Sequence, residues 1–321
     1  MRFASLSSAL GLALIAACGG SSSSTPDAPP AAADANPNGP VNEGFTTPTA
    51  VTHAWVKENG AFVDKGDADW GCLNTPTADV ALAAPVSLTG KITDFQDMSK
   101  GVANAKISFF AGIDYATPIA SVTAAADGTY TGVTIPAGSK RIGYKITATA
   151  YKDTFLLNQY YTAASTTQNI SAISEGLATA LPAFVGFDRM PGTGVLAGAM
   201  RDCKGQEVAN AIATVSSVSL MHKHLTNGTA VARTFYFSAA AGLPVKPNMS
   251  AHTGYATDKD GLFAVFDLPP QTATAFVQVW GFRTSAELAQ GEAGLTLLAE
   301  LPAPVISETV ITGSIEPLRT N

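Results

Sequence analysis

Charged side chains are scarce in this sequence. Asp, Glu, Lys and Arg make up 14% of the 321 residues, whereas about a quarter is usual in soluble proteins. The 25 acidic residues outnumber the 19 basic ones, the net charge is −6, and Lys and Arg form no cluster. A chain with this charge distribution is a poor candidate for binding nucleic acid or anionic lipid.

Catalytic sequence motifs are missing as well. The chain has no His-Glu-x-x-His, no His-x-x-Glu of the kind found in zinc carboxypeptidases, no Gly-x-Ser-x-Gly and no phosphate-binding loop. It also lacks a Cys-x-x-Cys pair and any Cys/His spacing typical of zinc sites. We therefore predict a protein that is not an enzyme and that has no cofactor and no resident metal.

Long apolar runs are limited to the N-terminus. The stretch from Phe3 to Ala17 is apolar or small, follows the positive charge of Arg2, and is too short to span a bilayer. A stretch of this length and composition is typical of the hydrophobic part of an export signal. We predict a signal peptide over residues 1–17.

The end of that stretch, residues 14–18 with the sequence Leu-Ile-Ala-Ala-Cys, resembles the lipobox of bacterial lipoproteins. The resemblance implies cleavage before Cys18, diacylglycerol on its thiol and acylation of the new N-terminus. Two or more acyl chains anchor a protein stably, whereas one does so only marginally. Gly19 resembles an outer-membrane sorting signal, so we expect a lipid-anchored protein of the bacterial cell envelope, at the outer membrane. The alternative is an ordinary signal peptide followed by an incidental cysteine.

Residues 18–44 are rich in Ser, Pro, Ala and Gly and lack the apolar residues needed for a core. We expect a disordered, lipid-bearing tether there, able to hold the folded part several nanometres from the membrane. Removal of residues 1–17 takes away Arg2 alone and changes the net charge from −6 to −7.

Cysteine is rare too, with three residues, of which one is Cys18. In an exported protein the remaining pair, Cys72 and Cys203, suggests a disulfide. Such a bond would close a loop of more than 100 residues and fold the segment around Cys72 back onto the second half of the chain. Two free, buried thiols are the alternative.

What the chain does have favours an all-β protein. Gly (29) and Pro (19) are spread along it, Thr, Val, Tyr and Phe recur in short runs, and long helical patterns are missing. Asn59-Gly60 lies between two short apolar runs and predicts a hairpin. One short helix is expected over residues 170–181, where apolar residues have helical spacing before Pro182.

The chain also repeats itself. Two copies contain, in the same order, a Gly-x-[Ile/Met]-x-Asp strand, a Val-Ala-Asn-Ala segment, an Asp-Gly turn before an aromatic residue, an [Ile/Leu]-Pro turn and an alternating strand. The copies open at Gly90 and Gly198, and the second has an insert over residues 212–257. The Asp-Gly pairs predict hairpin turns, with Tyr130 and Phe263 facing the core. Several strands at this spacing describe a β-sandwich.

These motifs resemble those of the carboxypeptidase regulatory-like domain, over roughly residues 86–160 and 194–285. The resemblance implies a transthyretin-like (prealbumin-like) fold, a seven-stranded Greek-key β-sandwich, in each copy. The second copy departs from the pattern at Gln271, where Gly is usual, and in its insert. The known settings of the family are non-catalytic, and its motifs are structural, so they specify fold better than function.

We therefore predict two tandem sandwiches with additional segments. The expected order is a signal peptide (1–17), a tether (18–44), a small β segment that packs on a later module (45–85), a first sandwich (86–165), a connector with a short helix (166–193) and a second sandwich (194–321).

One cluster of histidines could bind a metal. On a strand, His222 and His224 would share one face, and His252 follows downstream, as in an intradiol dioxygenase-like iron site. Tyr236 and Tyr255 lie nearby in sequence. The alternative interpretation is an exposed loop without metal.

Two other groups of residues have a possible chemical role. Asp64, Asp67 and Asp69 resemble part of a calcium loop, as do Asp258 and Asp260, although the bidentate Glu of such a loop is missing. An aromatic group could form a sugar-stacking platform, although filling of the core explains these residues better. It consists of Trp55, Trp70, Trp280, Tyr160 and Tyr161.

The predicted function is that of a non-catalytic envelope lipoprotein. It would be a binding or structural module that presents two β-sandwiches to a protein, glycan or matrix partner. The expected partners are the membrane, through the lipid anchor, and an envelope protein or polysaccharide, but no nucleic acid. The alternative is a metal-dependent enzyme that uses His222, His224 and His252.

Overall fold

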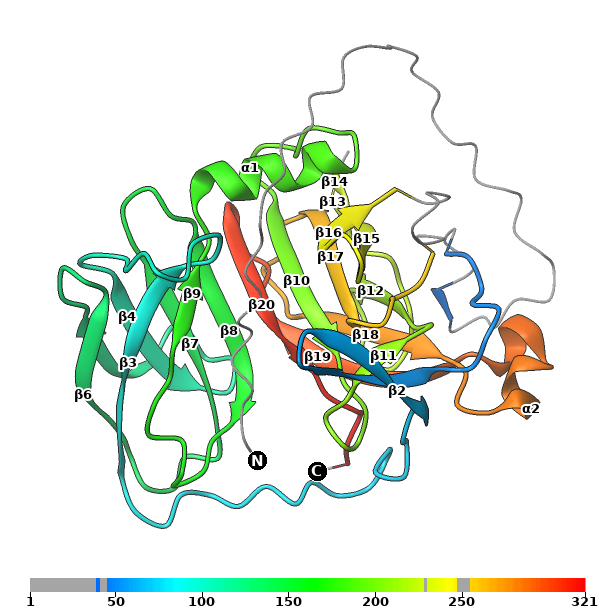
Figure 1. Ribbon diagram of the computed structural model, residues 1–321, viewed down its shortest axis with the longest axis horizontal. Coiled ribbons are helices and arrows are strands. Elements are labelled where there is room, and N and C mark those ends of the chain that lie inside the picture. The colour runs from blue at the N-terminus through cyan, green and yellow to red at the C-terminus, as the bar shows by residue number, and fades with distance from the viewer. Residues whose placement is uncertain (1–38, 41–44, 228–229, 247–254, 321) are drawn as a thin grey trace.

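The computed structural model describes residues 39–40, 45–227, 230–246 and 255–320 (Figure 1). The predicted signal peptide, the lipid-bearing Cys18, nearly all of the tether and His252 lie outside the described residues. Strand makes up 46% of the structure and helix 7%, which confirms the all-β prediction. No helix in the described part of the chain is long and apolar enough to cross a bilayer.

The first sequence copy folds into a seven-stranded Greek-key sandwich. Its strands are β3 (Val86–Asp94), β4 (Lys106–Ala111), β5 (Pro118–Thr123), β6 (Thr129–Ile135), β7 (Arg141–Thr147), β8 (Asp153–Tyr160) and β9 (Ile170–Ala172). One sheet has the order β6-β3-β9 and the other the order β5-β4-β7-β8. Apolar side chains from both sheets fill the space between them, among them Leu88, Ile107 and Ile146.

The second copy repeats this topology. Its corresponding strands are β10 (Gly194–Met200), β12 (Ile212–Ser216), β17 (Leu262–Leu268), β18 (Ala275–Gly281), β19 (Thr296–Ala303) and β20 (Thr309–Ile315). β10 lies between antiparallel β17 and parallel β20, just as β3 lies between antiparallel β6 and parallel β9. The sheet β12-β18-β19 corresponds to β4-β7-β8, and helix α2 (Ser285–Leu288) and the 3-10 turn η2 (Gly291–Gly294) separate β18 from β19.

The insert accounts for the main difference between the copies. It adds β13 (Thr226–Asn227), β14 (Ala230–Val231), β15 (Arg233–Ser238) and β16 (Leu243–Val245). β15 pairs with β17 and β16 with β15, so the insert extends the sheet that contains β10. Among the described residues of the second copy, no strand beside β12 corresponds to β5.

The repeated residues have the same contacts in both copies. The N–H of Ile92 donates to the carbonyl of Gly128 (2.8 Å), and that of Met200 donates to the carbonyl of Gly261 (2.9 Å). Gly128 and Gly261 have positive φ angles of 84° and 62°. The Asp-Gly turns therefore bring the backbone of the following strand directly onto the first strand of each copy.

The prediction that these turns close hairpins is wrong. Asp127-Gly128 joins β5 to β6, and these two strands belong to different sheets. The turn carries the chain across the sandwich, because β6 finds its hydrogen-bonding partner in β3 instead of β5. Tyr130 and Phe263 do face the core, with 3% and 0% of their surface exposed.

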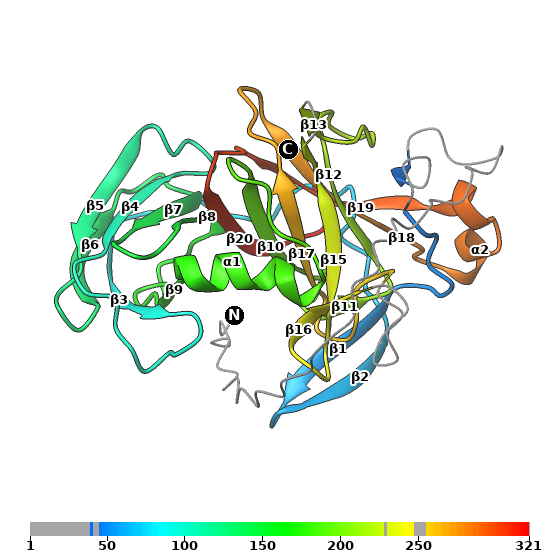
Figure 2. The same ribbon diagram turned by 90° about the horizontal axis from the view of Figure 1, so that it is seen from above.

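The two sandwiches share one sheet. β8 of the first module pairs in parallel with β20 of the second, with Val310 opposite Thr154 and Ile311 opposite Phe155. The result is a nine-stranded sheet with the order β16-β15-β17-β10-β20-β8-β7-β4-β5. Figures 1 and 2 show β20 at the centre, between β10 and β8. Because Phe155 and Leu157 of β8 also pack in the core of the second module, the modules form one body.

The connector helix begins later than predicted. Residues 170–172 form β9, because they pair with β3, and the helix α1 (Glu175–Phe184) starts after the N-cap Ser174. Pro182 lies in its last turn instead of ending it. Leu177 and Ala178 pack with Val195 and Phe266, so α1 covers one face of the shared sheet (Figure 2).

The segment before the first module packs on the second. β1 (His53–Glu58) and β2 (Ala61–Asp67) form the predicted hairpin, with Asn59 and Gly60 at positive φ angles of 50° and 86°. β1 also pairs with β11 (Glu207–Ala209) of the second copy, where Ala54 lies opposite Val208. The chain therefore starts on the second module and crosses to build the first.

Candidate functional site

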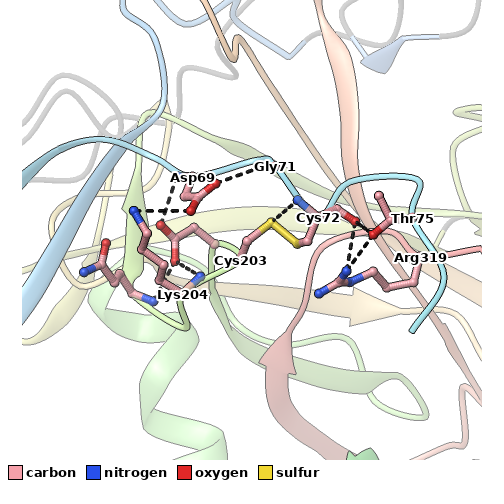
Figure 3. Close-up of a disulfide and its surroundings, with 9 residues drawn as sticks. Asp69, Gly71, Cys72, Thr75, Cys203, Lys204 and Arg319 are labelled. Atoms are coloured by element: carbon pink, nitrogen blue, oxygen red, sulfur yellow. Dashed lines mark hydrogen bonds and ion pairs between the residues drawn. A yellow bond between two sulfur atoms is a disulfide. The ribbon is translucent and has the colours of Figure 1, made fainter. Parts of the chain in front are cut away.

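The disulfide predicted from the cysteine count is present. Cys72 and Cys203 are bonded, and their Cα atoms are 5.7 Å apart (Figure 3). The N–H of Cys72 also lies 3.0 Å from the Sγ of Cys203. Cys203 lies in the turn that follows the first strand of the second copy, so the bond fixes the segment before the first module to the second module.

Hydrogen bonds around the disulfide tie three chain segments together (Figure 3). The N–H of Asp69 donates to Oδ2 of Asp202 (3.0 Å), and the N–H of Cys203 donates to the carbonyl of Asp69 (2.9 Å). Arg319, close to the C-terminus, donates to the carbonyl of Cys72 (3.0 Å) and to Oγ1 of Thr75 (2.9 Å). The disulfide thus stands in an ordered polar region where the segment before the first module, the turn after β10 and the C-terminal segment meet.

A groove of about 390 Å³ lies at one end of the seam between the modules. Arg141, at the start of β7, donates from Nε to Asp79 (2.5 Å), from Nη1 to the carbonyl of Asn158 (2.9 Å) and from Nη2 to Glu316 (2.8 Å). These bonds join the segment before β3, the first module and the chain after β20. Because one guanidinium holds three walls, the groove keeps a fixed width.

The lining of the groove is mixed in character. Lys140 and Arg319 add positive charge, and Leu301, Pro302 and Leu318 provide apolar surface. Its volume falls in the range of small-ligand sites, and its lining offers a partner both charged and apolar contacts.

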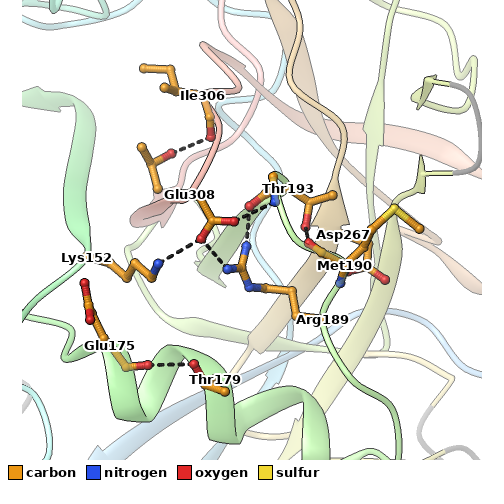
Figure 4. Close-up of polar contacts among 11 residues, drawn as sticks. Lys152, Glu175, Thr179, Arg189, Met190, Thr193, Asp267, Ile306 and Glu308 are labelled. Carbon is orange, nitrogen blue, oxygen red and sulfur yellow. Dashed lines mark hydrogen bonds and ion pairs between the residues drawn. The ribbon is translucent and has the colours of Figure 1, made fainter.

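A second polar cluster locks the opposite end of the seam (Figure 4). Glu308, just before β20, accepts from Nζ of Lys152 (2.8 Å), from Nη2 of Arg189 (2.5 Å) and from the N–H of Gly192 (2.6 Å). Burial by itself raises the pKa of Glu308, but these three donors outweigh it and hold the pKa at about 2. The ionised carboxylate therefore joins both modules and the connector at neutral pH.

The histidine cluster lies on the second module, beside the start of the described chain. His222 is buried and not exposed as the loop interpretation expected, and its ring centroid is 6.1 Å from that of His224. Phe45 packs edge-on against His222. The hydroxyl of Tyr236 is occupied by the N–H of Ala213 (3.1 Å). Within residues 45–227, 230–246 and 255–320 no three His, Cys, Asp or Glu side chains converge on a metal position.

Of the aspartates compared with a calcium loop, Asp64 and Asp67 both contact His53, whereas Asp69 has other partners. Asp64 accepts from the N–H of Gly66 (2.8 Å) and contacts His53 (2.6 Å), which lower its pKa. Asp69 accepts from the N–H of Gly71 (2.9 Å) and lies 3.2 Å from Nζ of Lys204. Asp67 lies 3.8 Å from Nδ1 of the same His53, so two of the carboxylates flank one histidine, but no three acidic or histidine side chains of the described residues converge on a metal position.

The aromatic residues do not form a platform. Trp280 is 3% exposed and packs in the core, and Tyr161 is 4% exposed. The indole N–H of Trp70 donates to Oγ1 of Thr52 (2.8 Å), and Trp55 lies on β1 under the ammonium group of Lys259. These aromatic residues fill or cover the core, which is the interpretation that the sequence favoured over a sugar-stacking platform.

Comparisons with known proteins found only distant likenesses. No family model and no curated protein matches the chain. Among solved structures, the chain is similar to the Bacillus anthracis TIE protein (11% identity, TM-score 0.22), covering 73% of this chain and about a third (34%) of that one. It is also similar to a mutant of the shaft pilin SpaA from Lactobacillus rhamnosus GG (11% identity, TM-score 0.19, 74% and 98% covered). A DUF3823 family protein from Parabacteroides merdae has 9% identity and a TM-score of 0.20, with 70% and 98% covered. Overlap at this level carries no information on ligand or activity.

Asp260, in the Asp-Gly turn of the second copy, makes stability depend on pH. Burial raises the pKa of Asp260 from 3.8 to about 7, although the hydrogen bond that its carboxylate accepts from the N–H of Leu262 acts to lower it. A raised pKa in the folded state stabilises the fold below about pH 4, and this contribution is lost as the pH rises to about 7. Asp260→Asn keeps an acceptor for Leu262, and we expect it to raise the unfolding free energy at pH 8 by about 2–4 kcal/mol.

Chemical denaturation at pH 5 and pH 8 measures this effect. The matched control is Asp127→Asn, at the equivalent position of the first copy, where the carboxylate is exposed and hydrogen bonds from Thr129 lower its pKa. The control should not gain stability at pH 8. Equal responses of the two variants would contradict the assignment to Asp260.

Proposed function

We propose that this protein is a lipid-anchored, non-catalytic protein of the bacterial cell envelope. Its two sandwiches, which resemble carboxypeptidase regulatory-like domains, would act as one rigid block that binds an envelope protein or polysaccharide. The supporting observation is the shared nine-stranded sheet, which the Cys72–Cys203 disulfide reinforces. A rigid block presents its groove at constant shape, which reduces the entropy lost when a partner binds.

The groove at the seam is the proposed contact for the partner. Lys140 is exposed there and has no ion pair in the described structure, so it is available to an acidic or hydroxylated ligand. The mature protein should capture a partner from envelope extracts, and Lys140→Glu should weaken the capture. Lys106→Glu, at an exposed position of β4 outside the groove, is the matched control and should leave the capture unchanged. Capture that is equal for all three proteins would place the contact elsewhere.

Lipid attachment at Cys18 is tested directly. The sequence of residues 14–18 implies that the thiol of Cys18 is the acceptor of diacylglycerol. Cys18→Ala should therefore abolish both incorporation of labelled fatty acid and processing to the mature form. Equal labelling of variant and parent would refute the anchor, whereas loss of labelling in Cys72→Ala would point to the wrong cysteine.

Elemental analysis distinguishes the proposed function from the alternative, a metal-dependent enzyme built around His222, His224 and His252. Under the proposed function the purified protein contains no stoichiometric iron or zinc. Stoichiometric metal that is lost in a His222→Ala/His224→Ala variant would support the alternative and overturn the proposal.

A further inference from the structure

The insert of the second module presents two large apolar side chains to solvent. Leu220 is 59% exposed and Met221 is 46% exposed, and together they form what we call the apolar tip of the loop over residues 217–223. This loop has no acidic residue and one basic residue, Lys223. Loop tips are usually polar, and neighbouring exposed apolar residues mark a contact surface.

Buried polar groups hold the loop from below. The hydroxyl of Ser216 accepts from the N–H of Val218 (3.0 Å) and lies 2.9 Å from the carbonyl oxygen of Met221. Nε2 of Gln278, a fully buried side chain of β18, donates to the carbonyls of Val218 (3.2 Å) and Met221 (3.0 Å). The carbonyl groups at the base of the apolar tip are thus satisfied from inside the protein.

Glu300 of β19 holds the tip itself. Its carboxylate accepts from the N–H of Leu220 (2.7 Å) and from the hydroxyl of Ser219 (2.6 Å). Leu220 has a φ angle of 62°, in the left-handed region that side chains other than glycine rarely adopt. Such a conformation persists only where its surroundings enforce it. The exposure of Leu220 and Met221 is therefore built into the loop and does not result from disorder.

These bonds make the tip compatible with a lipid surface. In an apolar medium every unsatisfied backbone group is costly, so a loop enters lipid only if its polar groups are already paired. The N–H of Leu220 and the carbonyl of Met221 are paired with Glu300, Ser216 and Gln278.

The position of the tether gives the second argument. The continuous described chain begins at Phe45, directly after the predicted tether, and its ring lies 5.9 Å from that of His222, the residue after Met221. The lipid-bearing segment therefore joins the folded part beside the apolar tip. Because the predicted tether ends beside the tip, the proposed lipid anchor would bring the tip to the membrane.

We propose that the apolar tip docks onto the membrane that holds the lipid anchor, with Leu220 and Met221 inserted at the lipid interface. This inference rests on the proposed lipid attachment at Cys18. The tether raises the local concentration of the tip at the membrane, so a contact too weak to bind alone becomes effective. Because the contact is apolar and the chain has no basic patch, docking should not require anionic lipid.

The test uses the full lipidated chain in phosphatidylethanolamine–phosphatidylcholine vesicles with brominated acyl chains, which quench tryptophan in contact with the lipid. A Met221→Trp variant should be quenched more strongly than the parent, whose three native tryptophans give the background. Val80→Trp is the matched control, since Val80 is 70% exposed but lies outside the insert, and its tryptophan should not be quenched. Adding Leu220→Ser to Met221→Trp should lower the docking constant by about tenfold or more.

Each other outcome contradicts the inference in a distinct way. Chains that float with vesicles but show no extra quenching at position 221 would refute docking and leave the anchor intact. Chains that do not float would refute the anchor and the docking with it. A tryptophan at 221 that is shielded in whole envelopes but not in protein-free vesicles would show that a protein covers the tip.

Discussion

The Cys72→Ala/Cys203→Ala variant is expected to lose about 4–5 kcal/mol of unfolding free energy relative to the oxidised protein, an upper figure from the chain-entropy relation. The two cysteines are 131 residues apart in sequence, so their bond removes a large loop entropy from the unfolded chain. Because β8 and β20 still join the modules in the variant, it should fold, with a lower denaturation midpoint.

Denaturation of the parent with and without reductant provides the internal control. The reduced parent should unfold close to the midpoint of the variant, and the variant should not respond to reductant. A midpoint that is the same in all four samples would contradict the prediction, as would two alkylatable thiols in the oxidised protein besides Cys18.

The Gly128→Ala variant should lose about 3–4 kcal/mol of unfolding free energy, because a steric clash and an unfavourable backbone conformation add up at this position. An added Cβ would lie 2.3 Å from the carbonyl oxygen of Ile92, and Gly128 has a φ angle of 84°. Gly132→Ala isolates the second cost, since Gly132 has a φ angle of 74° but nothing within 4 Å of an added Cβ. We expect the Gly132→Ala control to lose about 1 kcal/mol of unfolding free energy.

The difference between the two glycine variants measures the close approach of the turn to the first strand. Thermal or chemical unfolding of both proteins provides it. Equal losses of unfolding free energy would mean that backbone conformation alone selects glycine at position 128. The carbonyl of Ile92 would then move away from the added Cβ in the variant at little cost.

The repeat was the most informative feature of the sequence, because its motifs are turns and close contacts that have one structural solution. Gly90 and Gly198 illustrate this: an added Cβ would lie 2.9 Å from the hydroxyl of Tyr130 or 2.8 Å from the ring of Phe263. The all-β sandwich fold and the disulfide followed from local patterns and composition, and both are confirmed.

The joining of the modules could not be predicted, because strand pairing between β8 and β20 depends on residues more than 150 positions apart. Alternation within each strand shows which face is buried but does not identify the neighbouring strand. The same limit applies to the groove, where Arg141 meets Glu316 only once the sheet has formed. For the apolar tip, a Leu-Met pair was a visible signal, but exposure depends on the buried Gln278 and on Glu300.

The central position of β20 has a consequence for biogenesis. A chain that is synthesised or exported N-terminus first completes every strand of the first module while β8 still has an open edge, and β10 lacks its parallel neighbour as well. Both edges are closed by β20 (Thr309–Ile315), which is made after all the other described strands. Such a protein cannot mature one module at a time, since its final cooperative step waits for the end of the chain. Truncation before Thr309, which removes β20, should therefore leave two unpaired sheet edges exposed and mark the product for degradation.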